Sequence, residues 1–92
     1  MIKSFQHKGL KVFYETGSTR GIRADHAKRL KRILAVLEQA QNPDDADMPG
    51  FRLHLLKGDL AEYWAITVSG NWRVTFRFTG QDVELLNYLD YH

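Results

Sequence analysis

The chain has 92 residues, 43% of them hydrophobic and 12% aromatic, a composition that predicts one small globular domain and excludes a disordered tail. It contains no cysteine, which excludes a disulfide framework, a thiolate metal site and a cysteine nucleophile and favours a reducing, cytoplasmic location. The net charge is only +2, but residues 1–32 carry nine Lys and Arg against two acidic residues, a pattern that indicates either a polyanionic partner or simply a solvated helix face.

The N-terminal segment is expected to form a short strand and then a helix. Residues 2–5 are apolar and include a β-branched residue, whereas residues 7–15 place Leu10, Phe13 and Tyr14 at helical spacing before Gly17, a natural helix stop. Lys3 and His7 interrupt the N-terminal residues before an apolar signal segment can form, so no export is expected. Residues 18–23 contain two arginines and are interpreted as a loop able to touch phosphates.

The clearest helical pattern runs from about residue 24 to residue 41. Asp25 lies in its first turn, where the helix dipole favours an anion, and the Asn42-Pro43 pair ends the run. Its apolar run is far too short to cross a bilayer, so no membrane partner is expected. The two sides of the predicted helix carry apolar residues (Ala27, Leu30, Ile33, Leu34, Leu37) and basic residues (Lys28, Arg29, Lys31, Arg32).

After an acidic loop at residues 44–50, the apolar period changes to two, which predicts strands. The strands are expected at residues 51–56, 63–68 and 71–78 and at the C-terminus, separated by short turns, so they form an antiparallel meander. The helices then cover the apolar face, which gives an α+β fold. The side chains predicted to point toward the helices are Trp64, Ile66, Val68, Trp72, Val74, Phe76 and Phe78.

The opposite face of the predicted sheet carries the chemically active side chains. His54, Arg73 and Arg77 alternate onto it, and Lys57 follows at a strand end. The last strand, with apolar residues 85, 86, 88 and 89, is expected to hold the C-terminal residues Asp90, Tyr91 and His92 near the same face.

Two imidazoles with cations and no metal motif match one reaction in particular. In this reaction an RNA 2′-hydroxyl attacks the adjacent phosphate, which requires a base, an acid and positive charge for the phosphorane. Histidine suits both proton transfers because its unperturbed pKa is near 6.5. Taken one at a time, the residues have structural alternatives. A lone histidine on a strand is more often a hydrogen-bonded structural residue, Arg73 or Arg77 can pair with Glu84 or Glu62 across strands, and Tyr91 can be a core aromatic. Their joint placement predicts a ribonuclease with no metal and no cofactor.

The sequence also resembles the HigB-type toxins of toxin-antitoxin systems, a branch of the RelE-like ribosome-dependent mRNA endoribonucleases. The resemblance extends over nearly the whole chain. It is carried by Met1-Ile2-Lys3-Ser4-Phe5, Leu53-His54-Leu55-Leu56-Lys57-Gly58-Asp59, Tyr63-Trp64, Asn71-Trp72-Arg73 with Thr75-Phe76, Asn87-Tyr88, and Asp90-Tyr91-His92. It implies a compact microbial-ribonuclease-like fold, cleavage of mRNA in the ribosomal A site, and inhibition by a helix-turn-helix antitoxin of the HigA type.

The resemblance also implies roles for individual residues. It makes His54, Asp90, Tyr91 and His92 active-site residues, and it gives supporting substrate contacts to the residues Lys57, Asn71 and Arg73. We take the two histidines as the acid-base pair in either order, Asp90 as an orienter or alternative base, Tyr91 as a stacking or hydrogen-bonding group, and Arg73 with Lys57 as charge stabilisers.

Three partners are expected from the resemblance together with the charge pattern. The basic side of the helix, Lys28, Arg29, Lys31 and Arg32, is predicted to dock on the 70S ribosome that holds the mRNA. The antitoxin is expected to cover basic or apolar surface without reaching His54, and operator DNA is expected to be contacted only through the antitoxin. The competing interpretations are a non-catalytic RNA-binding module and a subunit that only binds a partner protein.

Overall fold

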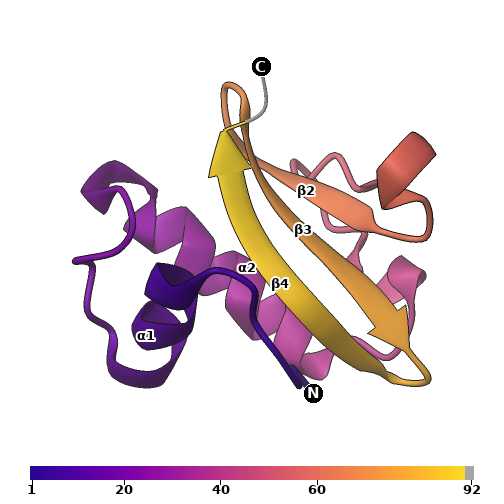
Figure 1. Ribbon diagram of the computed structural model, residues 1–92, viewed down its shortest axis with the longest axis horizontal. Helices are drawn as coiled ribbons and strands as arrows, with labels where there is room; N and C mark the ends of the chain where they lie inside the picture. Colours follow the sequence, from indigo (N-terminus) through magenta and orange to yellow (C-terminus); the bar gives the residue numbers. More distant parts are fainter. Residues whose placement is uncertain (91–92) are drawn as a thin grey trace.

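The computed structural model describes residues 1–90 of the chain. Two helices, α1 (Lys8–Thr16) and α2 (Ala27–Gln39), precede a four-stranded antiparallel sheet whose strands lie in the order β1-β2-β3-β4. The strands are β1 (His54–Leu55), β2 (Trp64–Ser69), β3 (Trp72–Thr79) and β4 (Asp82–Asp90). Helix α2 lies across one face of the sheet and α1 lies beside β4 (Figure 1). The predicted α+β meander is therefore confirmed.

Helix α1 begins and ends as its sequence predicts. The Leu10 N–H donates to Nδ1 of His7, the N-cap residue, over 2.9 Å. At the other end Gly17 adopts a left-handed conformation with φ of 80°, and its N–H donates to the Phe13 carbonyl over 2.8 Å. A residue with a side chain is strained at such an angle, so glycine stops the helix here.

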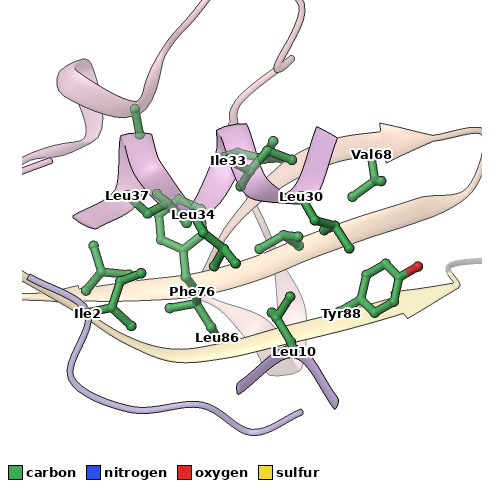
Figure 2. Close-up of a cluster of buried hydrophobic side chains, with 14 of the residues drawn as sticks. Ile2, Leu10, Leu30, Ile33, Leu34, Leu37, Val68, Phe76, Leu86 and Tyr88 are labelled. Atoms are coloured by element: carbon green, nitrogen blue, oxygen red, sulfur yellow. The ribbon is translucent and has the colours of Figure 1, made fainter. Parts of the chain in front are cut away.

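Helix α2 is slightly shorter than predicted. Residues Ala24–His26 form a 3₁₀ turn before it, and the α-helix ends at Gln39, ahead of a second 3₁₀ turn at Pro43–Ala46 inside the predicted loop. Its apolar stripe is buried as expected and packs on β3 and β4 around Phe76 and Leu86 (Figure 2). The buried residues of the stripe are Leu30, Ile33, Leu34 and Leu37. No helix within residues 1–90 is long and apolar enough to span a membrane.

The predicted strand at residues 51–56 is largely wrong. Only the two residues of β1 pair with β2, and Leu55 is 51% exposed. Phe51 is instead fully buried under α2, and its carbonyl accepts the Thr67 N–H over 2.9 Å. Cations of α2 also stack on the Phe51 ring. The segment is therefore held by the buried Phe51 side chain and by a few backbone hydrogen bonds, and not by a continuous strand ladder over residues 51–56 as the alternating pattern predicted.

The helix-facing side of the sheet agrees with the predicted apolar set in most positions. Ile66, Val74 and Phe76 are fully buried. Trp64 and Trp72, predicted as core residues, are only partly buried and pack against the edge of the core.

The last strand contains an irregularity that the sequence pattern did not indicate. The register between β3 and β4 shifts between Thr75 and Arg77, and Leu85 on β4 has a φ of 58°, so one residue of β4 bulges out of the ladder. The Leu85 N–H donates to the Ser4 hydroxyl over 2.9 Å. The N-terminal segment supports this side of β4 through two parallel bridges, Ile2 with Val83 and Phe5 with Leu86. Leu85 and Leu89 were predicted to be buried, but both are only half-buried.

Candidate active site

The candidate site lies on the face of the sheet that points away from α2. His54 pairs with Ala65, Ala65 with Thr75, and Thr75 with Asn87, so these four residues form one row across all four strands. Residues directly opposite in an antiparallel pair project from the same face. Arg73 is two residues from Thr75 and therefore shares that face. The strand pairing thus puts His54 and Arg73 on one face of the sheet, together with Asn87 of β4.

The floor of this face is made of small side chains. Ala65 and Thr75 are only 1% and 3% exposed, although they point away from the helices. These two residues of the middle strands are therefore covered, while His54, at the edge strand, remains exposed. His54 therefore stands at the exposed border of this face.

The hydrogen bond of His54 defines which of its nitrogens can react. Nδ1 lies 2.9 Å from the carbonyl oxygen of Arg52. A carbonyl only accepts hydrogen bonds, so Nδ1 must carry the proton of the neutral ring and donate it. Nε2 then keeps its lone pair and is the nitrogen able to take a proton from a substrate.

Arg73 is oriented by the turn between β2 and β3. Its Nη1 donates to the carbonyls of Gly70 over 2.7 Å and of Trp72 over 3.0 Å. Both bonds use the same nitrogen, Nη1, and they fix the orientation of the planar guanidinium. The guanidinium has five N–H donors in all, so donors on its other nitrogens can bind an anion. Asn71 occupies the same turn and is exposed. Lys57 is exposed on the segment between β1 and β2, at the start of a 3₁₀ turn over Gly58–Leu60.

Arg77 forms a cross-strand ion pair, which is the structural alternative to a role in the site. It shares the polar face, but its Nη2 lies 3.2 Å from Oε1 of Glu84, directly across the strand pair. Its guanidinium carbon also lies 5.9 Å from the centre of the Tyr63 ring. The cross-strand ion pair with Glu84 occupies this cation at the end of the sheet away from Arg73.

The register separates Asp90 from His54. Asp90 is opposite Trp72, and Tyr88, two residues earlier, is opposite Val74 in the core, so Asp90 leaves β4 on the helix side. It lies near Arg23, whose pKa is raised mainly by its hydrogen bond to Asp25, with a smaller electrostatic contribution from Asp90. Asp90 therefore stands at the end of the sheet nearest Arg73 but on the opposite face.

The two remaining predicted residues, Tyr91 and His92, lie outside the residues that the structure describes. Within residues 1–90, no three histidine or acidic side chains are grouped so that they could hold a metal ion.

Comparison with known proteins decides the family. Residues 3–92 match the family model of the HigB-like toxins, described as the RelE-like toxin of the type II toxin-antitoxin system HigB. The chain belongs to this family. Over its full length it is also 46% identical to the full length of the endoribonuclease HigB of Proteus vulgaris. The resemblance stated from the sequence is thereby confirmed.

Comparison of structures supports the fold independently. The chain matches a chain of the YoeB-YefM complex from Staphylococcus aureus with a TM-score of 0.64, although only 14% of the residues are identical. The match covers all of this chain and 98% of the other. At this low identity the match concerns the backbone arrangement only.

The basic side of α2 in this HigB-like toxin divides into two groups. Lys28, Lys31 and Arg32 are exposed. Arg29 is half-buried, and its Nη2 donates to the carbonyls of Gly50 over 2.6 Å and of Thr67 over 2.9 Å. Arg29 therefore joins α2 to the sheet and to the loop before it. The other three cations remain exposed, although the guanidinium of Arg32 also stacks on the Phe51 ring.

The toxin also contains a buried polar cluster that sequence reasoning missed. His26 is 4% exposed, and its Nδ1 lies 2.6 Å from the hydroxyl of Tyr88, which is equally buried. The Tyr88 ring stacks on Trp72 with ring centres 4.7 Å apart and meets the edge of His7 at 5.3 Å. The cluster anchors β4 two residues before Asp90. The signal was available, because His26 continues the buried helical spacing of Leu30 toward the N-terminus.

Proposed function

We propose that this protein is a ribosome-dependent mRNA endoribonuclease that cleaves mRNA in the ribosomal A site by metal-independent attack of a 2′-hydroxyl. Membership of the HigB-like family and the full-length similarity to an endoribonuclease make it an endoribonuclease toxin of a toxin-antitoxin system, in agreement with the class predicted from the sequence. The observation that carries the finer proposal is the exposed His54, held in the tautomer that leaves Nε2 basic, on the same face as Arg73.

His54 acts as the general base in this scheme. Its Nε2 takes the proton of the 2′-hydroxyl, and the oxygen attacks the neighbouring phosphorus. The 5′-oxygen of the next nucleotide leaves and takes up a proton, so the products are a 2′,3′-cyclic phosphate and a 5′-hydroxyl end. The Arg52 carbonyl fixes the ring and stabilises the imidazolium that forms during the step.

Arg73 stabilises the charge that develops on the phosphorane. His54 and Arg73 are separated by two strand spacings and one step of two residues along a strand. With about 4.8 Å per strand and about 6.8 Å per two residues, their Cα atoms are about 12 Å apart. We place the phosphodiester in this span, between the His54 imidazole and the N–H donors of Arg73 that do not bond to the Gly70 and Trp72 carbonyls. We assign Lys57 and Asn71 to contacts with the flanking nucleotides.

The C-terminal residues complete the proposed site on the strength of the family resemblance. His92 serves as the general acid that protonates the leaving oxygen, and Tyr91 stacks on or hydrogen-bonds to a base. Asp90 acts as an orienter from the far side of the sheet end, in keeping with its position opposite Trp72. We do not assign it the role of alternative base, because its side chain leaves the face opposite to that of His54.

In this proposal the ribosome aligns the message for cleavage. The described residues of this face include no feature that would grip and bend a free strand so that the 2′-hydroxyl lines up with the phosphate, and such alignment is worth several kcal/mol. We assign docking on ribosomal RNA to Lys28, Lys31 and Arg32, the exposed cations of α2. Arg29 is left out because its bonds to the Gly50 and Thr67 carbonyls hold the fold.

The partners and location follow from the same proposal. A cytoplasmic ribonuclease must be held inactive, so the toxin pairs with a helix-turn-helix antitoxin of the HigA type, which alone contacts operator DNA. The similar solved structure is itself that of a complex, YoeB-YefM.

The deciding experiment induces the protein alone in cells and maps the 5′ ends of messages. We expect growth arrest and cuts within translated codons. His54→Ala should lower cleavage about 10²- to 10⁴-fold while the protein keeps its melting curve. His7→Asn is the matched control, because it removes a histidine on the other side of the molecule and keeps an N-cap acceptor. Full activity of His54→Ala would refute the base assignment, and absence of cleavage by the unaltered protein would favour a non-catalytic RNA-binding module.

Ribosome dependence has its own test. Cleavage of one message is compared free in solution and on programmed ribosomes, at two salt concentrations. Changing Lys28, Lys31 and Arg32 to Gln should weaken ribosome binding and reduce its salt dependence, whereas Arg73→Ala should spare binding and slow cleavage. Equal rates on free and ribosome-bound message would contradict the proposed dependence.

A further inference from the structure

A buried cluster of three side chains lies behind the end of the sheet that carries Arg73 and Asp90. Its members are His26, Trp72 and Tyr88, and each of the three contacts the other two. Tyr88 points from β4 toward the α2 side of the sheet, near the C-terminal end of the strand (Figure 2). His26 and Tyr88 are each only 4% exposed, so bulk water does not compete for their polar atoms.

The hydrogen bond between His26 and Tyr88 gives the cluster a defined geometry. The Tyr88 oxygen lies 2.6 Å from His26 Nδ1 and accepts the backbone N–H of Arg23 over 3.5 Å. Burial is the main cause that raises the pKa of Tyr88, so the hydroxyl keeps its proton at physiological pH and can donate it to the imidazole. A buried hydrogen bond is directional and is costly to leave unmade, so it holds its partners in one arrangement.

Trp72 connects this bond to the groups that are proposed to act on RNA. Its ring stacks on Tyr88 with ring centres 4.7 Å apart and meets the edge of His26 at 5.5 Å. Its carbonyl accepts a hydrogen bond from the Arg73 guanidinium over 3.0 Å, and its backbone pairs with Asp90 on β4. A shift of Trp72 therefore moves an acceptor of Arg73 and the strand partner of Asp90 together.

Strand pairing by itself is weakest at this end of the sheet. Trp72 is the first residue of β3 and Asp90 is the last residue of β4, so their pairing closes the ladder, where strands fray most readily. On the other side of β3 the pairing with β2 is irregular, because the register shifts between Thr67 and Ser69. The contact with His26 therefore supplies tertiary support where the ladder needs it.

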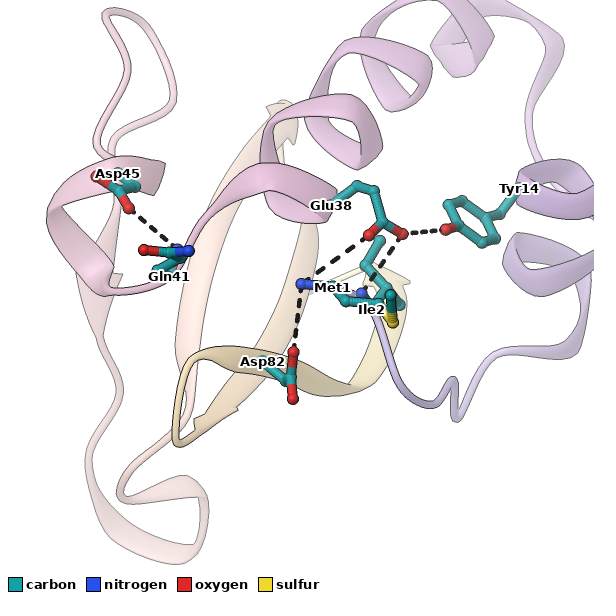
Figure 3. A network of polar contacts seen from close by, with 7 residues as sticks. All are labelled: Met1, Ile2, Tyr14, Glu38, Gln41, Asp45 and Asp82. Atoms are coloured by element: carbon teal, nitrogen blue, oxygen red, sulfur yellow. Dashed lines mark hydrogen bonds and ion pairs between the residues drawn. The ribbon is translucent and has the colours of Figure 1, made fainter.

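The opposite end of β4 is tied by a second tyrosine contact, which lies away from the proposed site (Figure 3). The Tyr14 hydroxyl donates to the Glu38 carboxylate, which lies 3.9 Å from the amine of Met1. That amine lies 3.4 Å from Asp82, the first residue of β4. Tyr14 is 38% exposed, so this network lies at the surface. The two ends of one strand thus offer a matched comparison, in which the same tyrosine hydroxyl is removed at each.

We propose that His26 and Tyr88 are positioning residues for RNA cleavage, which act through Trp72 and touch no part of the substrate. This inference rests on the proposed function, because it names the residues that hold the groups of that site. Their bond keeps the ends of β3 and β4 in one arrangement, so that Arg73 and Asp90 stand at a fixed separation. A misplacement of about 1 Å can lower the rate of an enzyme about 100-fold, even when its cause lies far from the reacting atoms. Because ribosome docking is assigned to α2, loss of the bond should slow cleavage without weakening binding.

The test compares Tyr88→Phe with Tyr14→Phe in single-turnover cleavage of one message on programmed ribosomes, at a temperature where melting curves show both variants folded. Tyr88→Phe should lower the maximal rate about 10- to 100-fold and change the half-saturating toxin concentration less than about twofold. Tyr14→Phe, which also loses a tertiary hydrogen bond, should change both quantities less than about twofold. His26→Asn should keep the rate within about threefold, because its side-chain oxygen can accept the Tyr88 proton, whereas His26→Leu should lose as much as Tyr88→Phe.

A failure of this inference can be told apart from a failure of the proposed function. A folded Tyr88→Phe variant that cleaves at the parental rate, equal losses in the two tyrosine variants, or a folded His26→Asn variant no faster than His26→Leu would each overturn the positioning role. Absence of cleavage by the unaltered protein would overturn the proposed function, and hydrogen exchange then still tests the positioning. Tyr88→Phe should speed amide exchange at residues 73, 89 and 90 at least about tenfold more than at residues 82–84, and equal acceleration along β4 would overturn the inference.

Discussion

The buried contact between His26 and Tyr88 offers a quantitative test of what holds β4 in place. Tyr88→Phe removes one oxygen atom and keeps the ring, so the stacking on Trp72 and the burial of the ring are preserved. The Tyr88 oxygen accepts the Arg23 N–H over 3.5 Å and bonds to His26 Nδ1 over 2.6 Å, which fits a hydroxyl that donates its own proton to the imidazole. The substitution leaves Nδ1 of a side chain that is 4% exposed without this partner.

The expected cost follows from that orphaned nitrogen. Leaving a buried hydrogen-bonding group unsatisfied costs about 1–3 kcal/mol, and each kcal/mol lowers the Tm of a domain of this size by about 4–8 °C. Urea unfolding should show a lower midpoint with an unchanged slope, because the same surface is exposed on unfolding. Tyr63→Phe is the matched control, since its half-buried ring packs beside Arg77, and it should change stability by less than about 0.5 kcal/mol.

A double substitution tests whether the loss of stability comes from the unsatisfied His26 nitrogen. Replacing both partners by apolar groups removes the unsatisfied group as well as the bond, so His26→Leu combined with Tyr88→Phe should cost less than the sum of the single changes by about 1 kcal/mol or more. Strict additivity, or a Tyr88→Phe variant as stable as the parent, would show that the short contact contributes nothing to stability.

Three further predictions concern stability. Burial lowers the pKa of His7, so the unfolded chain binds the proton more readily; stability should fall as the pH drops below about 6.5, and His7→Asn should flatten this part of a pH-dependent urea series. Arg29→Gln should cost about 1–3 kcal/mol by freeing two carbonyls, whereas Lys28→Gln on the exposed side should stay within about 0.5 kcal/mol, as thermal melts can show. Ser4→Ala removes the acceptor of the Leu85 N–H and should lower stability by about 1–2 kcal/mol, with faster amide exchange at residue 85; unchanged exchange there would contradict the role given to this hydroxyl.

Part of the candidate site could be predicted from the sequence alone. Strict alternation along residues 72–78 was enough to place Arg73 on the polar face, because β3 is paired on both sides and has no freedom to rotate. Local rules also identified Gly17 as the end of α1 and the apolar stripe of α2. The behaviour of Arg29 could not be predicted, because its neighbours Lys28 and Lys31 have the same charge and only the position of the Gly50 loop draws one of them inward.

The sequence by itself determined the order of the elements and the helix-facing side of the middle strands, because these depend on periodicities that each segment carries within itself. Only the tertiary structure decided the conformation of the two outer strands of the site, β1 and β4. Phe51 enters the core and shortens β1 to two residues. The bulge at Leu85 reverses the alternation of β4, so that Tyr88 turns to His26 and Asp90 to the helix side, while Asn87 joins the row of His54. A one-residue bulge exchanges the two faces of every residue beyond it, and this one is supported by Ser4, more than eighty residues away along the chain, where no local pattern can indicate it.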